Sequence, residues 1–234
     1  MPLMSSYKAQ QPSTMFSEAQ MAIIGRTEEY VRTSLCGEGS GHDWWHIVRV
    51  RNLGRTLAQR ESADPFIVEL TCLLHDIGDH KATGGDTSVG PAMIREWLSS
   101  LAVEERVTNA VTEIVVAMAV VDAGIKASLH TVEGRVVNDA DALDAMGAIG
   151  VARVFTFGGA RGRLIYDPAV EPVRYASLDE YRNNNAPSVN HFYEKLLLLE
   201  SLMQTDAGRS IARGRHEFME RFLAQFFSEW EGVQ

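Results

Sequence analysis

Apolar residues recur every three or four positions through most of the chain, which is the spacing of one face of an α-helix. The first such stretch begins at Ser17, which forms a capping-box pattern with Gln20, and it ends near Gly37. The same periodicity predicts further helices over residues 43–61, 65–78, 86–97, 103–120, 139–155, 190–203 and 207–230. Most of the chain is therefore expected to be helical.

Signals for β-structure are weak. Alternation of apolar and polar residues, the period of a β-strand, is found only over residues 134–137. Residues 158–187 are rich in glycine, proline and asparagine and are expected to be mostly loop. We therefore predict an all-α fold, in which residues 17–232 form a single helical domain and residues 1–16 form a polar, flexible leader.

The composition is that of a folded protein, with 45% hydrophobic and 23% charged residues, and 234 residues are ample for a sizeable core. The 31 acidic residues outnumber the 22 basic ones, so the formal net charge is -9. This balance disfavours polymeric nucleic acid and anionic membranes as partners. It leaves room for a small phosphorylated ligand, because a bound metal ion or a local cluster of cations can set the field at one site.

The cellular location is predicted from what the chain lacks. Its two cysteines cannot build a disulfide framework, which favours a reducing compartment. No apolar run approaches the roughly 18 to 20 residues of a membrane-spanning helix. The first 15 residues lack the apolar segment of a signal peptide. We therefore expect a cytoplasmic protein with no membrane partner.

Histidine and aspartate residues gather near the ends of three predicted helices. His46 lies one turn into the second helix, His75 and Asp76 end the third, and Asp139 and Asp141 open the sixth. Two imidazoles and two carboxylates could together bind one Mn, Fe, Co, Ni or Zn ion. A carboxylate at the C-terminal end of a helix, as at Asp76, is opposed by the helix dipole and calls for a counter-charge.

Each of these residues also has an ordinary structural explanation. A lone histidine on a helix, such as His46, is more often a surface residue or a hydrogen-bonded core residue than a ligand. His75 could bond the last carbonyl groups of its helix. For Asp139 a helix N-cap is the favoured interpretation, and Asp141 could merely complement the helix dipole.

Four motifs carry a family resemblance. They read Gly-His-Asp-Trp-Trp-His at residues 41–46, His-Asp-Ile-Gly-Asp-His-Lys at 75–81, Asp-Ala-Asp-Ala-Leu-Asp-Ala at 139–145 and Asn-His-Phe-Tyr-Glu-Lys-Leu at 190–196. With them the chain resembles the HD-domain superfamily of metal-dependent phosphohydrolases over about residues 20–230. It is most similar to a bacterial branch resembling nucleoside triphosphate pyrophosphohydrolases. The resemblance implies an all-α HD-domain bundle.

The resemblance also implies a metal centre. Its ligands would be His46, His75, Asp76 and Asp141, with Asp139 as the competitor for the fourth place. Residues 114–122 offer no histidine where some relatives carry ligands for a second metal, so we expect a single ion. We expect this divalent ion to be Mn2+ in the first place, with Fe, Co, Ni, Zn or Mg as alternatives.

The activity that the resemblance implies is hydrolysis of a nucleoside triphosphate to monophosphate and pyrophosphate. A nucleotide monophosphatase or a phosphodiesterase would use the same ion and the same water. A non-catalytic nucleotide sensor is a third hypothesis from a different class. The intact ligand positions together with Asp79 favour an enzyme, because a binding module does not need a carboxylate that activates water.

Other residues are expected to act on the substrate. Asp79 stands where related nucleotidases carry an acidic catalytic residue, and it could orient or deprotonate the attacking water or protonate the leaving oxygen. A turn-forming aspartate after Gly78 is the alternative. Lys81 is the second catalytic candidate. Basic side chains are the candidates for binding the substrate, although an exposed surface role suits most of them as well: His42, His80, Arg161, His191 and Lys195.

Large apolar residues on the last predicted helix recur at helical spacing. We expect them to pack in the core or to form the contact of a homodimer: Phe218, Met219, Phe222, Phe226 and Trp230.

Overall fold

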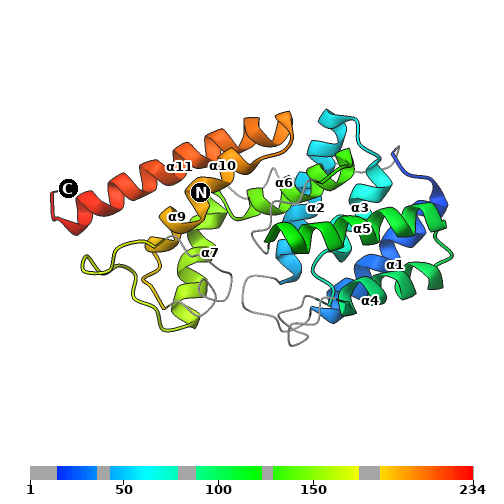
Figure 1. Ribbon diagram of the computed structural model, residues 1–234, viewed down its shortest axis with the longest axis horizontal. Helices are drawn as coiled ribbons and strands as arrows, with labels where there is room; N and C mark the ends of the chain where they lie inside the picture. The colour runs from blue at the N-terminus through cyan, green and yellow to red at the C-terminus, as the bar shows by residue number, and fades with distance from the viewer. Residues whose placement is uncertain (1–14, 36–42, 79–87, 123–128, 174–184, 234) are drawn as a thin grey trace, which may run out of the picture.

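The computed structural model describes residues 15–35, 43–78, 88–122, 129–173 and 185–233 (Figure 1). Within these ranges the regular structure is entirely helical and contains no strand, which confirms the predicted all-α fold. None of the helices in the described ranges combines the length and the apolar character that crossing a membrane requires.

Helix α3 lies among α1, α2, α5 and α6 (Figure 1), and its residues from Phe66 to Leu74 are all buried. A helix that is apolar on every side belongs in a core, and α3 contacts α1, α2, α5 and α6 while α4 packs on α5. The bounds are α1 Glu18–Ser34, α2 Trp44–Glu61, α3 Pro65–Leu74, α4 Val89–Ser100 and α5 Glu105–Asp122.

Three helix starts follow the expected capping chemistry. Ser17 and Gln20 form a complete capping box at α1. The side chain of Asp43 accepts from the backbone N–H of His46 at α2, and the side chain of Asp64 accepts from the first turn of α3. The starts predicted for these helices are therefore confirmed. Asp86, the predicted cap of α4, lies outside the described residues.

The prediction around residue 139 was wrong. Helix α6 spans Val132–Asp144, and its N-cap is Thr131, whose side chain accepts from the backbone N–H of Gly134. Residues 134–137 are therefore helical, and Val136 and Val137 are fully buried in the core. A second helix, α7 Gly147–Ala160, starts separately at Gly147, which has a left-handed φ of 68°.

The helix predicted over residues 190–203 is divided. The segment contains α9 Asn190–Glu194, the 3-10 helix η1 Leu196–Leu198 and α10 Leu199–Leu202. The break lies at Lys195, whose φ of -140° is not helical. The end of α3 also differs from the prediction, because this helix stops at Leu74 and residues 75–78 form a turn instead of a last helical turn.

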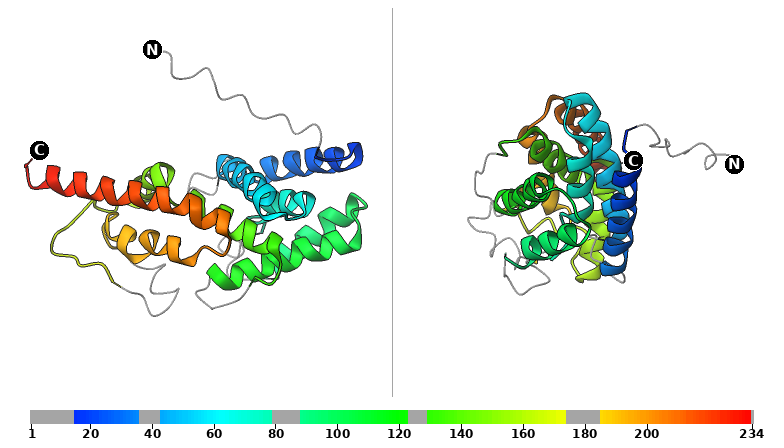
Figure 2. Two further views of the ribbon diagram at one scale, coloured as in Figure 1. Left: turned by 90° about the horizontal axis from the view of Figure 1, so that it is seen from above. Right: turned by 90° about the vertical axis from the view of Figure 1, so that its right-hand side faces the viewer.

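The last helix, α11 Asp206–Trp230, has 25 residues and is about 37 Å long. It runs along one side of the molecule beside α9 and α10 and contacts α7, α6 and α2 (Figure 2). On this side Phe222 packs against Phe155 and stacks on Phe192. The core prediction for the last helix is confirmed for Met219, which is fully buried.

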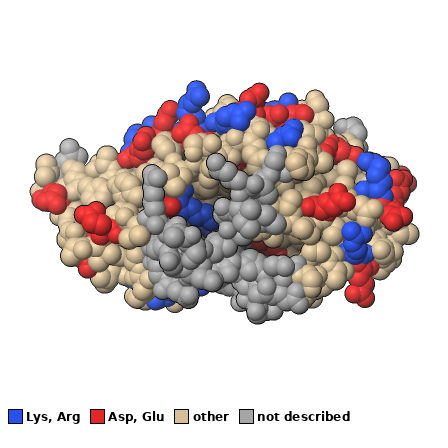
Figure 3. Space-filling model, in the orientation of Figure 1, with Lys and Arg blue, Asp and Glu red and all other residues tan. Residues whose placement is uncertain are grey.

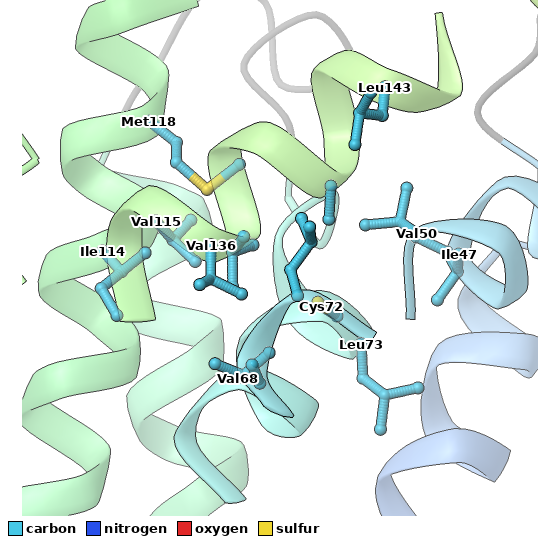
Figure 4. Packing of buried hydrophobic residues seen from close by; sticks show 14 of the residues in the cluster. Ile47, Val50, Val68, Cys72, Leu73, Ile114, Val115, Met118, Val136 and Leu143 are labelled. Carbon is cyan, nitrogen blue, oxygen red and sulfur yellow. The ribbon is translucent and has the colours of Figure 1, made fainter. Parts of the chain in front are cut away.

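Part of the core lies where α2, α3, α5 and α6 meet. Figure 4 shows the side chains that pack there: Ile47, Val50, Val68, Cys72, Leu73, Ile114, Val115, Met118, Val136 and Leu143. Helices α2 and α3 approach so closely that a Cβ atom on Gly54 would lie 2.6 Å from the Sγ atom of Cys72. This close contact sets the distance between α2, which contains His46, and α3, which His75 directly follows.

The predicted leader, residues 1–16, overlaps the described part of the chain at residues 15 and 16. Residues 1–14 lie outside the described part of the chain. Phe16, which was assigned to the leader, is buried and packs against Phe66 with ring centroids 6.5 Å apart.

Candidate metal centre

The side chains of three residues surround the Nε2 atom of His46. Together with His46 they come from three parts of the fold. His46 lies in the first turn of α2, His75 and Asp76 directly follow α3, and Asp141 lies in the last turn of α6. From His46 Nε2 the distance is 3.3 Å to His75 Nε2, 3.4 Å to Asp76 Oδ2 and 3.3 Å to Asp141 Oδ1. The structure thus brings together the four residues that the resemblance proposes as ligands.

The other nitrogen of each imidazole ring faces an acceptor. His46 Nδ1 lies 2.8 Å from Asp144 Oδ2, and His75 Nδ1 lies 3.0 Å from the carbonyl oxygen of Cys72. An acceptor at this position places a proton on Nδ1, so that Nε2 of each neutral ring carries a lone pair. Two lone pairs and two carboxylates then face one another. Such a group of buried acceptors needs a positive charge at its centre, either a proton or a metal ion.

The pKa values of the group reflect this crowding of acceptors. Burial by itself would lower the pKa of His46, but the hydrogen bonds to Asp141 and Asp144 outweigh it and raise the pKa to about 9. Burial would raise the pKa of Asp141, but its hydrogen bond with His46 and the nearby charge of His75 hold it well below the usual range. The site therefore attracts cations.

The donor set and its spacing fit a transition-metal ion. Atoms that lie about 2.1 Å from one ion, at angles of about 90° to 109°, are about 3.0 to 3.4 Å apart. The three distances at His46 Nε2 agree with this range, whereas His75 Nε2 lies 3.5 Å from Asp76 and 3.9 Å from Asp141. Ligand atoms of His46, His75 and Asp141 all lie within 4.8 Å of one another and could hold an ion.

The four side chains differ in their exposure. The exposed fraction is 1% for His46, 4% for His75, 13% for Asp76 and 29% for Asp141. The histidines therefore form the closed side of the group and the carboxylates the open side. Figure 3 shows one face of the molecule, on which basic and acidic side chains are mixed, most densely along the upper edge.

Asp139 does not compete for the centre. It is fully buried in the middle of α6, and its carboxylate accepts from the backbone N–H groups of Gln204 and Thr205. The expectation that Asp139 caps its own helix was wrong, because α6 begins seven residues earlier at Val132. Asp141 is likewise not in a first turn, and its side chain faces the two histidines instead.

Sequence reasoning missed Asp144, which lies behind the ring of His46. Its carboxylate accepts from Arg49 at 2.6 and 3.0 Å and from Arg153 at 2.8 Å. Burial raises the pKa of Asp144, but its hydrogen bonds with His46 and Arg49 bring the pKa down to about 2. The available signal was the helical spacing: Asp144 follows Asp141 by three residues, so both lie on one side of α6.

Four of the predicted site residues lie outside the described part of the chain: His42, Asp79, His80 and Lys81. The turn that leads to Asp79 is described up to Gly78, which has a left-handed φ of 65°. Gly78 lies close to the backbone of Gly90. A Cβ atom at Gly78 would lie 2.7 Å from the Cα atom of Gly90. The start of α4 therefore fixes the turn after His75 and Asp76.

The remaining candidates lie on the α7 and α9 side of α6, away from the junction of α2 and α3 (Figure 1). Arg161 follows α7, and its guanidinium lies 4.2 Å from the ring centre of Phe157. Lys195 follows α9 and is exposed. Burial and the charges of Lys195 and Arg163 lower the pKa of His191 to about 3. His191 is therefore neutral at physiological pH and could contact a phosphate only as a neutral donor.

Known proteins resemble this chain in sequence and in fold. The family model of the HD domain matches residues 44–146, which include all four clustered residues. The crystal structure of an HD-superfamily hydrolase from Bacillus thuringiensis matches the fold with a TM-score of 0.73. The two sequences are 40% identical, and the match covers 91% of this chain and 98% of that chain.

A second relative is the Bacillus subtilis protein YpgQ, described as uncharacterized. It is 36% identical over 206 residues, which make up 87% of this chain and 92% of YpgQ. The crystal structure of YpgQ in complex with ADP has a TM-score of 0.70 at 31% identity and covers 90% of this chain and all of that chain. With these likenesses over nearly the full length of the relatives, the chain belongs to the HD superfamily of hydrolases.

Proposed function

We propose that this protein is a metal-dependent phosphohydrolase that cleaves a nucleoside triphosphate to monophosphate and pyrophosphate. One divalent ion, preferably Mn2+, would be held by His46, His75, Asp76 and Asp141. The observation that carries the proposal is the convergence of two imidazole lone pairs and two carboxylates on one point. The complex of the related YpgQ with ADP supports a nucleotide as substrate.

The chemistry follows from the donor set. A divalent ion at such a centre supplies a Lewis acid, which polarises a phosphoryl oxygen and lowers the pKa of water toward neutrality. The buried histidines of this chain would keep their lone pairs directed inward, because Asp144 and the Cys72 carbonyl occupy their Nδ1 sides. The substrate would approach from the open side at Asp76 and Asp141, which are the more exposed of the four.

The residues beyond the metal centre keep their proposed roles. Asp79, one residue after the turn at Gly78, would orient or deprotonate the attacking water or protonate the leaving oxygen. Lys81 would offset the charge that develops on phosphate in the transition state. Basic and polar side chains would bind the substrate: His42, His80, Arg161, His191 and Lys195. We further propose that the enzyme acts in the cytoplasm, in keeping with its small number of cysteines.

The test is a substrate screen on purified protein that has been stripped with EDTA and reloaded with Mn2+, Mg2+ or Zn2+. Nucleoside triphosphates, nucleoside monophosphates and cyclic nucleotides are each supplied, and pyrophosphate and free phosphate are measured separately. We expect metal-dependent release of pyrophosphate from triphosphates alone. Free phosphate from monophosphates, or cleavage of cyclic nucleotides, would overturn the choice of reaction.

Three variants locate the activity. His75→Gln removes a proposed ligand and should abolish both metal binding and turnover. His216→Gln is the matched control, because His216 lies on α11 near Glu200 and Glu220 and should leave both unchanged. Asp79→Asn should bind metal normally and lose turnover by about 100-fold or more, the scale of a general acid–base residue. Unchanged turnover in Asp79→Asn would remove Asp79 from the mechanism.

A further inference from the structure

Asp144 ends helix α6 and is only 1% exposed. One of its oxygens, Oδ2, lies 2.8 Å from Nδ1 of His46. Arg49 donates to both oxygens, through Nε at 2.6 Å and Nη2 at 3.0 Å, and Arg153 donates to Oδ2 at 2.8 Å. The carboxylate thus joins α2, α6 and α7 directly behind the imidazole ring that faces the candidate metal centre.

We infer that Asp144 is a positioning residue, which holds the ring of His46 so that the lone pair on Nε2 faces His75, Asp76 and Asp141. The inference rests on the proposed function, because holding the ring in this way matters only if Nε2 binds an ion. A free imidazole can turn about its bond to Cβ and can move its proton between the two nitrogens. An acceptor 2.8 Å from Nδ1 restricts both changes and makes Nε2 a better donor to a metal.

The two arginines orient Asp144 in turn. A guanidinium group offers a rigid set of N–H donors, and Arg49 uses two of them to bind both oxygens of the carboxylate. This contact fixes the plane of the carboxylate. Arg153 belongs to α7, so its bond to Asp144 links the position of α7 to the orientation of His46.

A purely structural role is the competing explanation, since an ion pair among three helices also stabilises the fold. The two explanations differ in what happens to metal binding when the protein stays folded. Asp139 provides a matched control, because it is another fully buried aspartate on α6. Its carboxylate accepts from the backbone and hydroxyl of Thr205, the backbone of Gln204 and the side chain of Asn138, and its described contacts include no histidine.

The experiment compares Asp144→Asn with Asp139→Asn in the full chain. Mn2+ affinity is measured by titration calorimetry at a temperature where circular dichroism shows each variant folded. The visible absorption spectrum of the Co2+-loaded protein reports the geometry around the ion. We expect Asp144→Asn to weaken Mn2+ binding by about 10- to 100-fold and to change the Co2+ spectrum. Asp139→Asn should lose stability and keep both the affinity and the spectrum of the wild type.

Unchanged affinity and spectrum in Asp144→Asn, or an equal loss of affinity in both variants, would overturn the inference. If Asp144→Asn does not fold, the milder variants Arg49→Gln and Arg153→Gln replace it, and each should weaken Mn2+ binding. Wild-type affinity in both would likewise overturn the inference. The proposed function fails separately: a wild-type protein that binds Mn2+ but cleaves no nucleotide leaves the role of Asp144 intact.

Discussion

Asp139 Oδ2 accepts two hydrogen bonds from Thr205, one from its backbone N–H at 2.8 Å and one from its hydroxyl at 2.7 Å. This pair joins the middle of α6 to the start of α11. The carboxylates on α6 thus have different partners, since Asp141 faces His46 and His75 while Asp144 lies behind His46. One buried helix therefore holds both the last helix and the candidate metal centre in place.

Replacing Asp139 with asparagine should lower the free energy of unfolding by about 1 to 3 kcal/mol, the cost of leaving a buried donor without its acceptor. Asparagine has one acceptor oxygen, and its amide N–H2 group would point toward the N–H groups that Asp139 now accepts. Urea unfolding in EDTA measures the change. A variant as stable as the wild type would show that the start of α11 does not depend on Asp139.

Two glycines of α11 should respond in opposite ways to alanine. A Cβ atom at Gly208 would lie 2.3 Å from Asp139 Oδ2 and 2.7 Å from Thr205 Oγ1, so we expect Gly208→Ala to destabilise the protein by about 1 to 3 kcal/mol. Gly214 has no neighbour within 4 Å of that position. Gly214→Ala should therefore stabilise the helix by about 0.5 to 1 kcal/mol. Thermal unfolding of the two variants checks the signs, and equal signs would contradict the packing described.

The sequence was sufficient for the all-α fold, because capping residues and helical periodicity act locally. The candidate ligands came from the motifs of the family resemblance, and the fold brings these four side chains close together. The sequence was insufficient for α6, because Asp139 looks like a helix cap until the long-range contact with Thr205 is known. The same limit applies to Asp144, whose role depends on Arg153 from the next helix. His191 was expected among the cationic substrate residues, but burial keeps it neutral, and burial depends on the packing of α9.

Glu69 should be the most costly single charge to remove from the α2–α3 contact. Its side chain is buried, and both Arg51 and Arg55 donate hydrogen bonds to it. Neutralising one partner of a buried ion pair typically costs about 3 to 5 kcal/mol, because the remaining charge loses its compensation. We expect a loss of this size for Glu69→Gln in urea unfolding. Glu113→Gln, at an exposed position on α5, is the control and should be close to neutral.

His191 should make the protein sensitive to acid. Its pKa is about 3 in the folded protein, below the usual value near 6.5 in an unfolded chain. Between these values the unfolded chain binds a proton that the native protein does not, so acid favours unfolding. The stability contribution is complete above pH 6.5 and is lost as the pH falls, by up to about 2 kcal/mol at pH 5.

Glutamine at position 191 cannot take up this proton, so His191→Gln should lose less stability than the wild type between pH 7.5 and pH 5. Urea unfolding in EDTA at both pH values gives the difference and keeps metal binding out of the comparison. His130→Gln is the control for the substitution itself, because His130 is an exposed histidine. Identical pH dependence in His191→Gln and the wild type would mean that His191 takes up its proton as readily in the folded protein as in the unfolded chain. The basic side chains of Lys195 and Arg163 would then not form the environment that keeps His191 neutral.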